Sequence, residues 1–144
     1  MVQTNIQMKF NNFGKVGTEV RKRLKKQVET SGAVVEVDCK KRITNPPKSG
    51  IIYTRKNGVK HQSSAPGESP AGDTGFLADN VVHTNEGLTS FIDVNTDYAS
   101  ALEFGSIDPK NRPAARPFMQ PSMNAETPKF IGGCEKAVSE GSSV

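Results

Sequence analysis

The 144-residue sequence contains no tryptophan, only two cysteines and two histidines, and no long apolar run. Cys39 and Cys134 stand far apart and belong to no Cys-x-x-Cys pair, so the sequence encodes no disulfide scaffold and no cysteine zinc site. No segment approaches the roughly 20 apolar residues that span a bilayer, and the start of the chain lacks the apolar core of a signal peptide. These absences predict a soluble protein, made in a reducing cytoplasm and without a membrane partner.

Motifs of catalysis and metal binding are also missing. His61 and His83 have no cysteine or carboxylate at the spacing of a metal site. There is no Walker motif and no Gly-x-Ser-x-Gly elbow. Asp73-Thr74-Gly75 has the letters of the aspartic protease motif, but that enzyme needs two such carboxylates, each after a long apolar strand. Here a Pro/Gly/Ser-rich loop precedes the one copy, which favours a turn. We therefore expect no enzyme, no cofactor and no metal site.

The composition predicts one modest domain. Hydrophobic residues make up 34% of the chain and aromatic residues 6%, which is enough for a single small core and leaves much of the chain too polar to bury. We interpret residues 1–144 as one domain, with an N-terminal arm at 1–10, an extended loop at 44–74 and a flexible tail at 140–144. Long loops, or surfaces that become ordered on assembly, are expected.

Positive charge is clustered along the chain although the net charge is only +4. The clusters are Arg21, Lys22, Arg23, Lys25 and Lys26; Lys40, Lys41 and Arg42; and Arg55, Lys56 and Lys60. A solvated helix face and a helix C-terminus explain the first two. The alternative is a small nucleic-acid-binding domain that uses the first cluster. No aromatic platform accompanies these cations, which disfavours single-strand binding.

Apolar spacing predicts a long N-terminal helix. Apolar residues recur at steps of three and four from Phe13 to Val28, and the phase is kept beyond Gly32 at Val35, Cys39 and Ile43. We expect one helix from about 13 to 42, started by Asn11 or Asn12 and ended by the sequence Asn-Pro-Pro at 45–47. Residues 33–37 are rich in valine, and a strand there is the alternative.

The rest of the chain reads as short elements and a second helical region. The expected elements are a weak hairpin at 51–59, a helical turn at 74–78, strands at 80–84 and 88–94 joined by a turn at 85–87, a short helix at 97–104 and a loop at 106–115. Helix resumes near Pro117, and Pro128 should interrupt it. Phe130, Cys134, Ala137 and Val138 would form one apolar face beyond it. The fold class is therefore α+β: long N-terminal and C-terminal helices packed on a small antiparallel sheet, with a long Pro/Gly-rich loop.

Two segments carry a family resemblance. The first, residues 64–77, has a small-Pro-Gly-Glu-x-Pro-Ala stretch before an Asp-Thr-Gly-x-Leu turn; the second, residues 98–122, combines Tyr-Ala, Glu-Phe-Gly and Arg-Pro-Phe. In order, these motifs resemble those of the neck or tail-completion proteins of tailed bacteriophages. The motif residues are Pro66, Gly67, Glu68, Asp73, Thr74, Gly75, Leu77, Tyr98, Ala99, Glu103, Phe104, Gly105, Arg116, Pro117, Phe118 and Pro121.

The motif residues read as scaffold when considered physically. Tyr98, Leu102 and Phe104 are expected in the core. Glu103 and Arg116 are expected either to form a partly buried ion pair or to be two independent surface charges.

The resemblance implies a structural virion protein. Such a subunit forms a ring, with a hexamer expected, in the virion neck around the DNA channel, after assembly in the host cytoplasm. Its partners would be a head-closure or connector protein and a tail terminator or tail-tube protein, with transient, non-specific DNA contact. Arg55, Lys56, Lys60 and His61 in the long loop are candidate lumen or partner contacts, and the alternative for this loop is a disordered surface loop. The alternative within this class is the tail terminator, which caps the tube.

Overall fold

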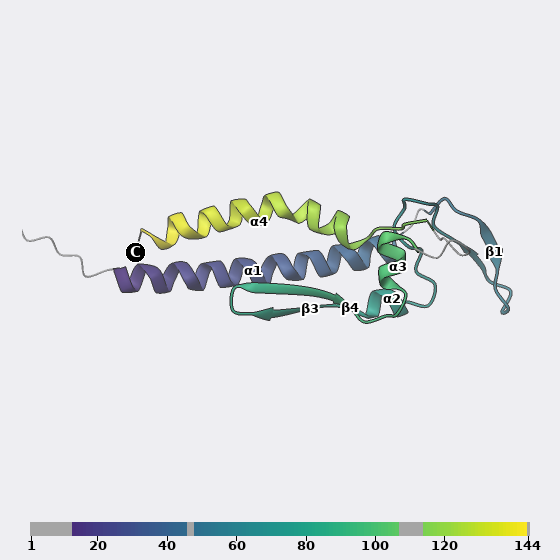
Figure 1. Cartoon of the computed structure of the whole chain (residues 1–144), viewed down its shortest axis with the longest axis horizontal. Helices are drawn as coiled ribbons and strands as arrows, with labels where there is room; N and C mark the ends of the chain where they lie inside the picture. Colours follow the sequence, from purple (N-terminus) through teal and green to yellow (C-terminus); the bar gives the residue numbers. More distant parts are fainter. Residues whose placement is uncertain (1–12, 46–47, 107–113, 144) are drawn as a thin grey trace, which may run out of the picture.

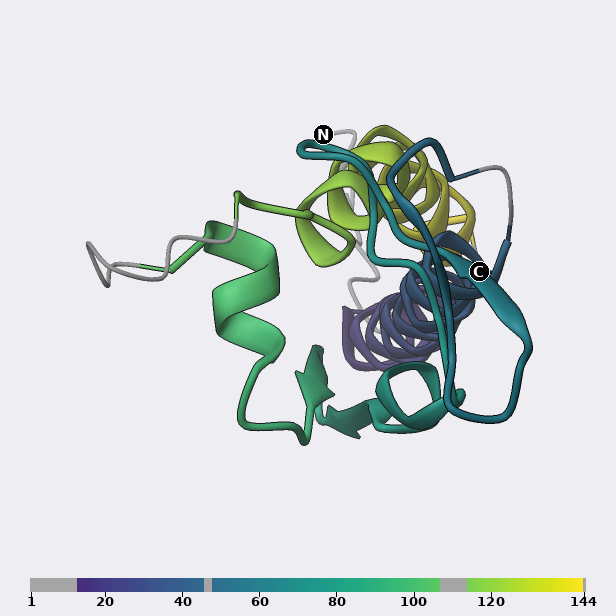
Figure 2. The ribbon, with the colours of Figure 1, turned by 90° about the vertical axis from the view of Figure 1, so that its right-hand side faces the viewer.

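A long helix forms the axis of an elongated molecule. The computed structural model describes residues 13–45, 48–106 and 114–143. Helix α1 (Phe13–Thr44) has helix α4 (Met119–Gly141) along one side and the hairpin of β3 (Val81–Glu86) and β4 (Thr89–Val94) along the other (Figure 1; Figure 2). This mixture of long helices and small antiparallel sheets confirms the predicted α+β class.

The remaining elements gather at the C-terminal end of α1. Helices α2 (Phe76–Asp79) and α3 (Ala99–Phe104) lie there, and a second hairpin, formed by β1 (Ile52–Thr54) and β2 (Lys60–Gln62), projects beyond them (Figure 1). A hairpin is therefore present within the long loop, but its second strand lies at 60–62, beyond the expected hairpin at 51–59. We call residues 50–62 the arm. Among the described residues, each sheet has only two strands.

Helix α1 is one uninterrupted helix, so the strand alternative for residues 33–37 is wrong. It extends to Thr44, two residues beyond the expected end, and its buried stripe includes Val28, Val35, Cys39 and Ile43. Gly32 is also buried, so the stripe continues across it without a break. The expected caps at residues 11 and 12 lie outside the described part of the chain.

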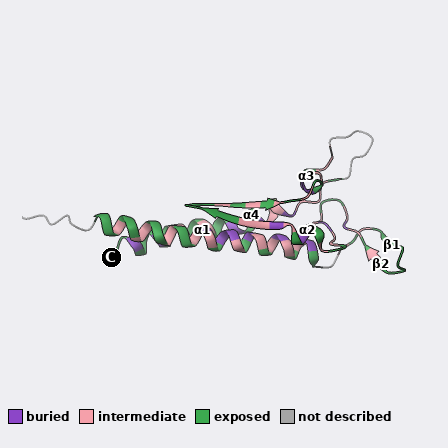
Figure 3. Ribbon diagram, turned by 90° about the horizontal axis from the view of Figure 1, so that it is seen from below, coloured by how far each residue is buried: buried purple, intermediate pink, exposed green. Residues whose placement is uncertain are grey.

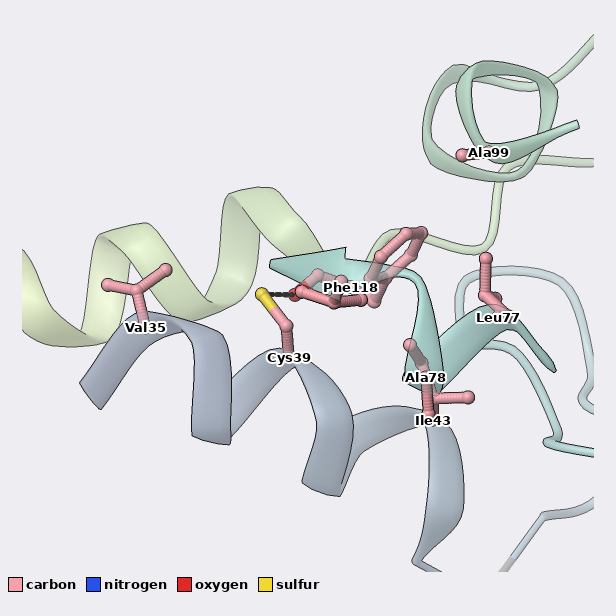
Figure 4. Close-up of a cluster of buried hydrophobic side chains, with 8 residues drawn as sticks. Val35, Cys39, Ile43, Leu77, Ala78, Ala99 and Phe118 are labelled. Carbon is pink, nitrogen blue, oxygen red and sulfur yellow. Dashed lines mark hydrogen bonds between the residues drawn. The ribbon is translucent and has the colours of Figure 1, made fainter. Parts of the chain in front are cut away.

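The core lies at one end of the molecule rather than along all of α1. Its fully buried side chains include Phe118, Ile43, Val81 and Cys39, and Leu77 packs beside them (Figure 4). Every buried residue of α1 falls at Val28 or later, so the first half of the helix is largely exposed (Figure 3). None of the described helices is both long and apolar enough to cross a membrane.

The sheet hairpin packs one face on α1. Alternate residues of β4, including Ile92 and Val94, are shielded, while Phe91 and Asp93 face outward. The pairing of Val81 with Val94 places the buried residue of β3 on the same inner face.

A polar contact also joins this hairpin to α1. His83 Nδ1 hydrogen-bonds the Glu36 carboxylate, and Lys40 lies on the other side of that carboxylate. The hydrogen bonds from Lys40 and His83 hold the pKa of Glu36 below its usual value.

Helix α4 contradicts two expectations. It continues through Pro128, which was expected to interrupt it, and it includes Gly141, which was expected in a flexible tail. The close packing of α4 on α1 accounts for both: a Cβ on Gly141 would stand 2.9 Å from Val20 Cα, and one on Gly133 would stand 2.3 Å from Gln27 Cδ. The expected apolar face is right for buried Ala137, whereas Val138 is 46% exposed.

Candidate assembly site

The two motif segments, residues 64–77 and 98–122, meet at the C-terminal end of α1. Gly67 N donates to Ala115 O at 2.9 Å, and Ser69 Oγ donates to Pro117 O at 2.8 Å. These bonds join segments that are well separated in the sequence. We call this contact region the motif junction.

Glu103 holds the start of α4 in place. It is buried, and its carboxylate accepts the backbone N–H groups of Phe118 at 2.9 Å, Met119 at 3.0 Å and Gln120 at 2.8 Å. Those N–H groups have no partner within the helix, and an anion there also interacts favourably with the helix dipole. Glu103 therefore acts as the N-terminal cap that the Phe118 side chain cannot supply.

The expected pairing of Glu103 with Arg116 is wrong, and so is the alternative of two surface charges. The Arg116 guanidinium donates instead to Ser64 O, with Nη2 at 3.3 Å, and to Ala114 O at 3.2 Å. Its backbone N–H donates to Leu102 O at 2.6 Å. Arg116 thus connects both motif segments by donating to carbonyl groups, while the Glu103 carboxylate caps α4.

Glu68 closes the loop at the opposite side of the junction. Its carboxylate accepts Ser49 N at 3.0 Å and Ala65 N at 2.9 Å, together with the Ser49 hydroxyl. The Ser49 hydroxyl, then the backbone N–H groups, lower the pKa of Glu68 to about 2. Lys48 donates to Arg42 O and Ser69 O nearby, and burial lowers the pKa of that lysine.

Acid should open this loop. Because the folded-state pKa of Glu68 lies below the unfolded value of 4.5, its stabilising effect is complete above pH 4.5 and is lost as the pH falls toward about 2. We expect the protection factors of the Ser49 and Ala65 amides against hydrogen exchange to fall through that range. Glu68→Gln should exchange rapidly at neutral pH and lose this pH dependence. Protection that stays constant down to pH 2 in the wild type would contradict the assignment.

Two of the three residues expected in the core at helix α3 are exposed instead. Tyr98, Leu102 and Phe104 were expected in the core, but Phe104 is 79% exposed and Tyr98 44% exposed, while Leu102 is only partly buried against the core. The helix has six residues, and the face that packs inward carries Ala99 and Glu103, one turn apart. The aromatic rings therefore lie on the outer surface of the motif junction.

The other motif residues divide between turns and core. Gly67, Gly75 and Gly105 have φ values of 84°, 83° and 80°, which side chains with a Cβ disfavour. Gly75 directly precedes α2, so the Asp-Thr-Gly triplet forms a turn at a helix start and not a strand end. The motif residues Leu77, Ala99 and Phe118 are buried, Pro117 and Pro121 are partly buried, and Pro66, Asp73 and Thr74 are exposed.

The arm is fixed at its turn end by an internal ion pair. Arg55 contacts the Asp73 carboxylate and hydrogen-bonds His61 Nδ1 at 2.8 Å. Of the four candidate contact residues in the loop, Arg55 and His61 are therefore engaged within the chain. Lys56 and Lys60 are exposed, and their side chains form no ion pair among the described residues.

A groove beside β4 was not anticipated from the sequence. It has a volume of about 260 Å³ and lies between α1, α4 and the β4 side of the hairpin. The apolar residues that line it include Val28, Val35, Leu88, Ile92, Met123 and Phe130. We call it the α1–α4 groove.

One buried carboxylate lines this groove. Glu126 is 8% exposed and accepts the Ser31 hydroxyl at 2.8 Å. It forms no ion pair with any described residue. Sequence reasoning did not single out Glu126. The feature that could have indicated its burial is its position one helical turn after Ser122, on the face of α4 that is buried.

The described residues contain no group of three or more His, Cys, Asp or Glu that could hold a metal ion. No family model, no curated protein and no solved structure matches this chain. The likeness of residues 64–77 and 98–122 to phage neck proteins accordingly stays a prediction from the motifs.

Proposed function

We propose that this chain is a non-enzymatic subunit of the neck of a tailed bacteriophage, where a ring of copies around the DNA channel completes the head–tail junction. The observation that carries the proposal is the motif junction. Residues 64–77 and 98–122, recognised separately as sequence motifs, contact each other and perform scaffold roles: Glu103 caps α4, Arg116 binds carbonyl groups and Glu68 closes a loop.

The shape and surface support an assembling subunit. The molecule is elongated, its core occupies one end, and the arm carries exposed apolar residues: Ile51 is 80% exposed, Ile52 59% and Val59 51%. A two-stranded hairpin with exposed apolar side chains is stabilised when another surface covers those side chains. Contacts between different surfaces of identical subunits repeat around a closed ring.

The proposal is tested by removing the gene and examining the particles. We expect the chain in purified virions by mass spectrometry, and we expect particles made without it to show separate heads and tails in electron micrographs. Wild-type chain supplied in trans should restore joined particles. Overlong or unfinished tubes would identify the tail terminator instead, and absence from virions would overturn both roles.

One surface favours a second candidate, a nucleic-acid-binding domain. Lys15, Arg21, Lys22 and Lys26 are exposed on the first half of α1, and their side chains form no ion pair among the described residues. A dedicated duplex-binding surface would give tight binding by the isolated chain that falls steeply with salt. A subunit through which DNA passes should bind duplex weakly, since many phosphate contacts would slow its passage.

A further inference from the structure

The arm has the surface of a segment that docks elsewhere. Residues 50–62 include three cationic residues and no Asp or Glu, and Arg55 is already paired with Asp73. Lys56 and Lys60 remain, together with the exposed apolar side chains of Ile52 and Val59. A hairpin of two three-residue strands is marginal without further packing, and both of its outer edges keep unpaired backbone groups within the described chain.

The α1–α4 groove offers the complementary chemistry. Its lining is apolar, Glu126 contributes a buried carboxylate, and β4 pairs only with β3 among the described residues, so the edge of β4 beside the groove is open. The hairpin that borders the groove adds two exposed carboxylates, Glu86 and Asp93, and contains no Lys or Arg.

The two surfaces cannot meet within one molecule. The arm projects beyond the C-terminal end of α1, whereas the groove borders the middle of α1, near Val28 and Val35 (Figure 1). The arm is also held in its place by Arg55 and Asp73. Only a second copy could bring the arm of this chain to this groove.

We propose that the arm of one copy docks in the α1–α4 groove of the next copy, with a strand beside the open edge of β4 and a lysine of the arm at Glu126. This inference rests on the ring of the proposed function and names its repeating contact. Strand addition contributes backbone hydrogen bonds, and the apolar lining covers Ile52 and Val59. The aliphatic stem of a lysine suits an apolar groove while its ammonium reaches the carboxylate.

The contact is tested with full-length chains that lack one surface each. Ile52→Asp with Val59→Asp replaces the two arm side chains proposed to enter the groove, and Thr127→Trp fills the groove from an exposed position of α4. Sedimentation velocity should show self-association of the wild type and a monomer for each variant alone. A mixture of the two variants keeps one arm and one groove, so it should form a species of two chains and nothing larger.

The control is Ile131→Asp, because Ile131 is 53% exposed on α4 and lies outside the groove. It should associate as the wild type does, and circular dichroism should show native helix content for every variant. A wild type that stays monomeric, variants that associate normally, or a mixture that stays monomeric would each overturn the contact. If the arm and groove variants still self-associated and the chain were present in virions, the proposed arm–groove contact would be overturned, but the proposed function would stand.

The lysine contact has a separate measurement. Glu126→Gln keeps the size of the side chain and its bond to Ser31 but removes the charge. It should weaken self-association about tenfold at low salt and reduce its dependence on salt. Lys56→Gln or Lys60→Gln should reproduce that loss and add little to Glu126→Gln in the double variant. An unchanged association constant in Glu126→Gln would overturn the lysine–carboxylate contact.

Discussion

Glu103→Ala should destabilise the protein by about 3 kcal/mol. The substitution leaves the N–H groups of Phe118, Met119 and Gln120 without their shared acceptor at a buried position. It also removes a negative charge from the start of a helix. Urea denaturation followed by circular dichroism measures the change, and the loss should appear as a lower midpoint with an unchanged slope.

Two further variants separate the cap from the side-chain volume. Glu103→Gln keeps one acceptor oxygen and almost the same volume, so about half of the loss should remain. Glu135→Ala removes an exposed glutamate from the same helix, α4, and should change the free energy of unfolding by less than about 0.5 kcal/mol. Equal stability of Glu103→Ala and Glu135→Ala would contradict the capping role.

Glu103 also shows what the sequence alone conceals. The residue type and the motif were visible, and an oppositely charged residue, Arg116, stood in the second half of the same segment. Whether the Glu103 carboxylate meets Arg116 or backbone N–H groups depends on how the chain folds back to bring the start of α4 to α3. Here the nearest donors without another partner are the backbone N–H groups at the start of α4. The same limit applies to Phe104, because a six-residue helix has too few positions for its spacing to reveal which face is buried.

Longer elements were easier to predict because their patterns repeat. Eight apolar positions in phase from Phe13 to Ile43 identified α1 as one helix. Helix α4 was harder, since Pro128 lacks an N–H and is costly inside a helix. Contact with α1 along its length compensates, and a Cβ at Gly133 or Gly141 of α4 would collide with Gln27 or Val20 of α1. The α1–α4 groove was not predictable, because it is lined by three elements that no sequence spacing relates.

Gly32→Val should destabilise the protein by about 3 kcal/mol, although glycine is a poor helix former. A Cβ at Gly32 would stand 2.0 Å from Ser90 Oγ and 3.2 Å from His83 Cδ2, so any side chain pushes the β3–β4 hairpin away from α1. Thermal or urea unfolding measures the loss.

The matched control is Gly17→Val in the same helix. Nothing lies within 4 Å of a Cβ at Gly17, so this variant should change stability by less than about 0.5 kcal/mol, in the stabilising direction. Equal effects at the two glycines would show that backbone propensity decides the outcome and that the hairpin does not pack closely on α1.

A double substitution locates the clash. Ser90 Oγ is buried without a hydrogen-bond partner, so Ser90→Ala alone should be neutral or slightly stabilising. Gly32→Ala alone should destabilise, and Ser90→Ala should recover part of that loss because it removes the nearest atom. Recovery of stability in the double variant would show that Ser90 and Gly32 are in contact. That contact packs the hairpin on α1 and places the edge of β4 beside the α1–α4 groove. If the two changes in the free energy of unfolding were strictly additive, the strain at Gly32 would not come from Ser90. The packing of β4 on α1 at Gly32 would then be contradicted.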